Sequence, residues 1–122
     1  MSDRDFPVLN LEDSITAEPP VLIMTKLILS EALRRNASEI RIMFDGEQSD
    51  ISLHFVVEQR PVKGIAPPIM MYTALCNLLC QRASIAYYEK GPDNGTLKTA
   101  NPESRWTMES VDLQRGFQLL RH

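Results

Sequence analysis

The hydrophobic pattern switches from a helical period to a two-residue period at residues 36–38, and this change constrains the fold more than any other feature. Val21 to Arg35 repeats apolar residues at helical spacing behind a Pro-Pro pair, which is tolerated in the first turn of a helix. Asn36 then favours the left-handed conformation that ends helices. From Ser38 the apolar residues alternate, which predicts a strand. The chain therefore needs an architecture in which a helix packs beside a sheet.

Two alternating segments predict an antiparallel hairpin. The first covers residues 38–44 and the second covers residues 51–58, with turn residues between them at 45–50. This loop length pairs apolar positions across the hairpin: Ile42 with Leu53, and Ile40 with Phe55. Arg41 and His54 then lie opposite each other on the non-core face of the sheet, where they are candidate site residues.

The second half of the chain predicts one more helix and three short strands. A proline-rich connection precedes a mostly apolar helix from Pro68 to Arg82. The strand candidates are "SIAYYE", "RWTMESV" and "GFQLLR", with a tight turn at "PDNG" and a polar loop after it. We expect an α+β fold, with a mostly antiparallel sheet of about five strands and both helices on one face. Residues 1–19 are expected to be a flexible or loosely docked arm, and residues 20–122 a single domain.

Charge and composition narrow the function classes. The net charge is -3 and the pI is near 5.3, so a polyanion-binding surface is not expected and nucleic acid is not a predicted partner. The acidic N-terminus lacks the basic and apolar regions of a secretory signal, and the run "PPVLIM" is too short to span a bilayer. We expect a cytoplasmic protein that does not insert into a membrane.

No residue pattern predicts catalysis, a metal or a cofactor. His54 and His122 lie far apart in the sequence, so a zinc site is not expected. Cys76 and Cys80 lie one helical turn apart and are expected to stay reduced, with Cys76 in the core and Cys80 at a half-exposed helix edge. The five glycines form no phosphate-binding loop, and His54 has no nucleophile near it in the sequence. We therefore expect a protein that is not an enzyme.

The first half of the first helix is apolar nearly all round. Ile23, Met24 and Leu27 fall among or beside its polar positions, which include Lys26 and Ser30. One interpretation is that the N-terminal arm or a neighbouring strand covers the three apolar residues. The other is that they form the surface for a partner protein or for a second copy of the chain.

The segment "PPVLIMTKLILSEALRRNASEIRI" resembles the start of the domain that precedes the motor in type II secretion and type IV pilus assembly ATPases, the GspE/PilB/PilT superfamily. The positions that fall on the family pattern are Leu27, Ile28, Leu29, Ser30, Glu31, Ala32, Ala37, Ser38 and Ile40. Asn36 replaces its helix-ending glycine, and Pro92, Asn94 and Gly95 echo a later turn. The resemblance covers most of residues 20–122 and implies a PAS-like domain with the order α-β-β-α-β-β-β.

The departures from that family concern its link to nucleotide. Its strand arginines correspond to His54 and Val56, and its Asp-Gly pair corresponds to Glu58 and Gln59. The chain has no Walker A motif, so the resemblance implies the pre-motor domain standing alone. We expect a non-catalytic interaction or regulatory module whose partner is a secretion or pilus motor component or a second copy. The alternatives are a PAS-like small-ligand sensor, with a pocket lined by residues such as Phe55, Tyr72 and Trp106, and a domain with residual nucleotide binding.

Overall fold

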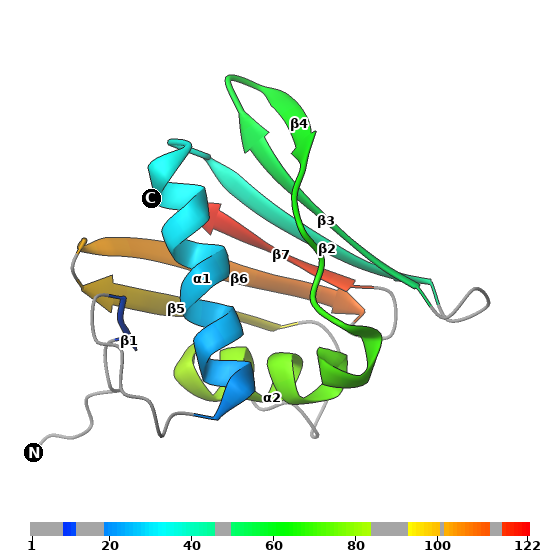
Figure 1. Cartoon of the computed structure of the whole chain (residues 1–122). Helices are drawn as coiled ribbons and strands as arrows, with labels where there is room; N and C mark the ends of the chain where they lie inside the picture. The colour runs from blue at the N-terminus through cyan, green and yellow to red at the C-terminus, as the bar shows by residue number, and fades with distance from the viewer. Residues whose placement is uncertain (1–8, 12–18, 46–49, 84–92, 101, 113–115) are drawn as a thin grey trace, which may run out of the picture.

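The computed structural model describes residues 9–11, 19–45, 50–83, 93–100, 102–112 and 116–122. These residues form two α-helices, one short 3-10 helix and seven strands (Figure 1). In chain order the elements are β1 (Leu9–Asn10), α1 (Pro20–Arg34), β2 (Glu39–Asp45), β3 (Asp50–Val57), β4 (Arg60–Lys63), η1 (Ile69–Met71), α2 (Tyr72–Ala83), β5 (Asp93–Ala100), β6 (Ser104–Asp112) and β7 (Gly116–Arg121). The α+β class predicted from the sequence is confirmed.

All the described strands belong to one sheet, in the order β1-β5-β6-β7-β2-β3-β4. The strands from β5 to β4 pair antiparallel, and β1 adds two residues parallel to β5. The prediction of about five strands is therefore too low, because β1 and β4 are short edge strands without a clear alternation. Figure 1 shows α1 crossing in front of the sheet and α2 below β5 in that view, and both helices pack into the core on the same face of the sheet. We call the opposite face, which no described helix covers, the open face.

Helix α1 begins behind Pro19, and Asn36 beyond its end has a φ of 57°, the left-handed conformation predicted there. Its core side includes the buried residues Ile28, Leu29 and Ala32. The prediction that Lys26 lies on the polar side is wrong, since Lys26 is only 8% exposed. A lysine stem can lie along apolar surface, so the covered sector of α1 is wider than its apolar residues indicate.

The β2–β3 hairpin has the predicted register. Ile42 lies opposite Leu53, Ile40 lies opposite Phe55, and Arg41 lies opposite His54. The register is well determined because a slip of one residue would move every apolar side chain to the open face. The hairpin thereby places the side chains of Arg41 and His54 on the open face.

Strand β4 differs from the sequence prediction, which makes this segment a proline-rich connection. It pairs with β3 through a tight turn in which Glu58 and Gln59 have φ values of 52° and 68°. Both values are left-handed, as a type I′ hairpin turn requires, although neither residue is glycine. After β4 the chain crosses the helix side of the sheet, where a Cβ on Gly64 would lie 2.5 Å from the Leu53 side chain.

The C-terminal strands differ in part from the prediction. Strand β5 occupies the segment predicted as a turn and a polar loop, whereas "RWTMESV" and "GFQLLR" lie largely in β6 and β7. The predicted strand "SIAYYE" lies outside the described residues. Among the β5 side chains that the structure describes, at positions 95–100, the buried ones are Leu97 and Thr99, with Lys98 exposed between them. One apolar residue in a strand is too weak a pattern to be recognised by alternation.

One hydrophobic core joins the two helices to the sheet. It extends from Leu9 in the N-terminal arm, which is 2% exposed, to Leu119 in β7. Cys80 is 1% exposed, so the prediction of a half-exposed position is wrong; the helix that carries it, α2, packs against β5 and β6. None of the described helices combines the length and the hydrophobicity that crossing a bilayer requires.

Candidate interaction surfaces

The outward side of α1 carries two large apolar side chains that its own chain leaves exposed. Ile23 is 40% exposed and Leu27 is 60% exposed. They lie one turn apart, on the side of the helix away from Leu29. Met24, the third residue of the predicted surface, is half-buried and packs against the core. We call Ile23 and Leu27 the α1 apolar pair.

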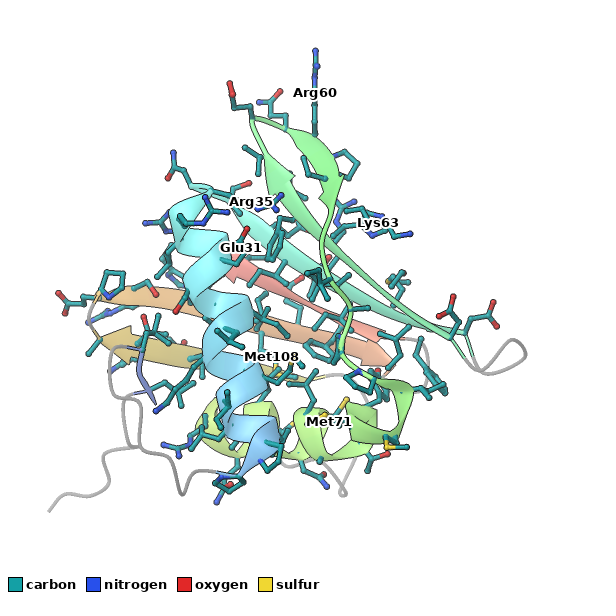
Figure 2. All side chains as sticks on the ribbon, viewed as in Figure 1. Glu31, Arg35, Arg60, Lys63, Met71 and Met108 are labelled. Carbon is teal, nitrogen blue, oxygen red and sulfur yellow. The ribbon has the colours of Figure 1, made fainter. Side chains whose placement is uncertain are left out.

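Glu31 binds two arginines, Arg34 and Arg35, at the C-terminal end of the same helix; Figure 2 labels Glu31 and Arg35 there. Arg34 donates to the carboxylate at 2.5 and 3.0 Å, and Arg35 donates at 2.6 Å. These hydrogen bonds, first from Arg34 and then from Arg35, lower the pKa of Glu31 to about 2. The Arg35 guanidinium also lies 5.4 Å from the centroid of the Phe55 ring. The cluster therefore ties the end of α1 to β3.

The open face carries a row of basic residues across three strands. Arg41 on β2 lies opposite His54 on β3, and Lys63 on β4 lies opposite His54 on the other side. Arg41 donates to Glu39 at 2.5 Å, and this hydrogen bond raises the pKa of the guanidinium. Sequence reasoning found Arg41 and His54 but missed Lys63, since β4 itself was missed.

Two like-charged pairs lie at opposite corners of the open face. Lys98 on β5 is directly opposite Arg105 on β6, and Asp45 on β2 is directly opposite Asp50 on β3. The basic corner, Lys98 with Arg105, lies level with the start of β2. Two backbone hydrogen bonds show this: His122 N donates to Arg105 O, and Arg121 N donates to Ser38 O. The acidic corner, Asp45 with Asp50, lies at the end of β2. Like charges in direct opposition destabilise a sheet.

Both cysteine thiols are buried. Desolvation raises the pKa of both the Cys76 and Cys80 thiols to about 11, which keeps them protonated at neutral pH. Among the residues that the structure describes, no three of the His, Cys, Asp and Glu side chains lie together as a metal site would require. The described core thus offers neither a thiolate nor a ligand cluster.

Comparison of the chain with known proteins gives no family from which a role for these surfaces could be taken. No protein-family model matches the chain, and no curated protein matches its sequence. The function has to follow from the surfaces themselves.

The residues proposed for a ligand pocket have separate packing partners. Tyr72 stacks on Phe44 with ring centroids 4.9 Å apart, and the Trp106 indole donates to Ser104 Oγ at 2.9 Å. Phe55 lies under Arg35, as described above. A depression of about 460 Å³ lies elsewhere, at the β5–β6 turn, and is lined by Lys98, Thr99, Ala100, Pro102, Glu103, Ser104 and Arg105. The three predicted residues are not among those that line it.

Proposed function

We propose that the chain is a non-catalytic protein-interaction or regulatory module that receives its partner on the α1 apolar pair. The observation that carries the proposal is the exposure of Leu27 and Ile23 on adjacent turns of one helix. The helix is a suitable docking element because the Glu31 cluster fixes its C-terminal end against β3. A partner that covers the pair gains the burial of apolar surface without reorganising the helix.

We further propose that the fold is PAS-like and related to the pre-motor domain of secretion and pilus ATPases. Two turns support the relationship. Asn36, which stands where that family has a helix-ending glycine, has a φ of 57°. Glu58 and Gln59, which stand where it has Asp-Gly, have φ values of 52° and 68°. Left-handed values at these positions are what a glycine-containing pattern would predict.

The partner in this proposal is a cytoplasmic component of a secretion or pilus motor. A regulatory role is favoured over nucleotide binding because His54 and Val56 replace the family's strand arginines. Val56 is 8% exposed and therefore offers little surface to a ligand. The packing of Tyr72 and Trp106 against protein neighbours does not favour the small-ligand sensor.

Titration calorimetry with the purified secretion or pilus motor ATPase of the same organism tests the proposal. The chain should bind saturably, and Leu27→Ala should weaken binding. Leu27 has 60% of its surface left to bury, and full burial of a leucine contributes about 1.5–3 kcal/mol, so the expected loss is about 1–2 kcal/mol, or roughly 5- to 30-fold. Thr73→Ala, at an exposed position of α2, is the control. Absence of binding, or equal binding by Leu27→Ala, would contradict the proposal.

A further inference from the structure

We infer that the open face of the sheet is a self-complementary surface that pairs with a second copy of this chain. The feature that points to it is the pair of like-charged corners, Lys98 with Arg105 and Asp45 with Asp50. Each corner is the electrostatic complement of the other.

A two-fold axis satisfies both corners at once. When two identical faces meet about an axis that lies in the interface and runs midway between the corners, the acidic corner of each copy meets the basic corner of the other. Two opposite-charge contacts then form across the interface, and each brings a like-charged pair of one copy against the oppositely charged pair of the other. The same patch serves both partners, as an isologous interface requires.

Two pairs of polar side chains in the middle of the open face are already hydrogen-bonded within the chain. Arg41 is hydrogen-bonded to Glu39 at 2.5 Å, and Gln118 donates to Glu109 at 2.8 Å. A second copy would therefore cover these four side chains without leaving them unpaired. Met43, which is 50% exposed, adds apolar surface on the same face. It is the one large exposed hydrophobic residue that the described part of this face presents.

The size of the face fits the same occupant. The face runs across the strands from β5 to β4 in the sheet order. With a spacing of about 4.8 Å between strands and a strand length of about seven residues at 3.3 Å each, its flat area is roughly 650 Å². A stable interface of ordinary size covers about 800 Å² per partner. Because accessible area exceeds the flat footprint, the face is large enough for a dimer.

The β4 edge of the sheet is poorly suited to pairing with another strand. Pro61 in β4 has no backbone N–H to donate, and Lys63 adds a charge to the same strand. At the other side of the sheet, β1 pairs with Thr99 and Ala100 at the end of β5. Association through the face is therefore favoured over pairing at the β4 edge.

Sedimentation equilibrium of the full chain with charge-swap variants tests the inference. The unmodified chain should show a concentration-dependent dimer. Lys98→Glu with Arg105→Glu, and separately Asp45→Lys with Asp50→Lys, should each weaken it by about tenfold or more. An equimolar mixture of the two double variants should dimerise again, because both corners then meet opposite charges. Raising the ionic strength from about 0.01 M to about 0.15 M shortens screening from about 30 to 8 Å and should weaken the unmodified dimer.

Arg60→Glu is the matched control for charge reversal, because Arg60 lies at the tip of the β3–β4 hairpin (Figure 2), outside the two corners. It should leave the dimer intact, and circular dichroism checks that every variant is folded. A strictly monomeric unmodified chain would overturn the inference, as would corner variants that dimerise unchanged or fail to restore pairing when mixed. If Leu27→Ala abolished the dimer, the second copy would be docked on α1, and the inference would also fail.

Discussion

Alanine substitutions at Leu27 and Leu29 should differ strongly in their effect on stability, although both residues lie in the middle of α1. Leu29 is 1% exposed and belongs to the core, so Leu29→Ala removes buried methyl groups and leaves a cavity, which costs about 2–5 kcal/mol. Leu27 is 60% exposed and has only the remaining burial to lose. At about 1.5–3 kcal/mol for a fully buried leucine, that loss is about 0.6–1.2 kcal/mol. The higher helix propensity of alanine offsets part of it.

Urea unfolding followed by circular dichroism measures the difference. Leu27→Ala should shift the midpoint only slightly, and Leu29→Ala should shift it several times further, both with an unchanged dependence on urea concentration. The comparison is well matched because the substitution, the helix and the distance from the helix ends are nearly the same. If Leu27→Ala cost as much as Leu29→Ala, Leu27 would be a core residue and the α1 apolar pair would not be a docking surface.

Three further predictions follow from local geometry. Gln59→Gly should raise the thermal midpoint of unfolding by the equivalent of about 0.5–1 kcal/mol. The substitution removes a left-handed conformation that costs a non-glycine residue about 1–2 kcal/mol, but it increases the entropy that the chain loses on folding by about 0.5–1 kcal/mol. A lower midpoint would contradict the strained turn. Gly116→Ala should lower the free energy of unfolding in urea by at least about 1–3 kcal/mol. A Cβ at this position would lie 2.2 Å from Ile42 O, and the φ of 135° is one that residues other than glycine rarely adopt. An unchanged free energy of unfolding would refute the close approach. The pKa of the Glu31 carboxyl is lowered from 4.5 to about 2. The stability that the ionised carboxylate contributes is therefore present above pH 4.5 and is lost as the pH falls toward 2. An NMR titration of the Glu31 side-chain ¹³C signal with a midpoint near 4.5 would show that the arginine contacts do not persist.

The parts of the fold that the sequence predicts are those with a strong hydrophobic period. Helix α1 and the β2–β3 hairpin were recognised because their apolar residues repeat regularly and the loop length determines the register, as in the pairing of Ile42 with Leu53. Strand β4 was missed because Pro61 lies in a segment too short to show alternation. Strand β5 was missed because Thr99, a polar residue, occupies one of its buried positions, where its hydroxyl accepts or donates a hydrogen bond with Ser104.

The candidate surfaces also contain residues that the sequence could predict and residues that it could not. Ile23 and Leu27 could be found from the sequence, since they are apolar residues in the polar sector of a predictable helix. The opposition of Lys98 and Arg105 could not, because it depends on a register between two strands of which one was not recognised. A sequence pattern determines which side of an element a residue occupies, whereas cross-strand neighbours depend on the pairing of distant segments.

Site-specific photo-cross-linking in the native organism tests most directly whether the α1 apolar pair receives a partner. A photoreactive phenylalanine analogue at position 27 should give a single major adduct, which mass spectrometry should identify as a secretion or pilus motor component. The same analogue in place of Thr73, an exposed residue of α2, should not give that adduct. No adduct at position 27, or the same adducts from both positions, would contradict the assignment of α1 as the docking surface.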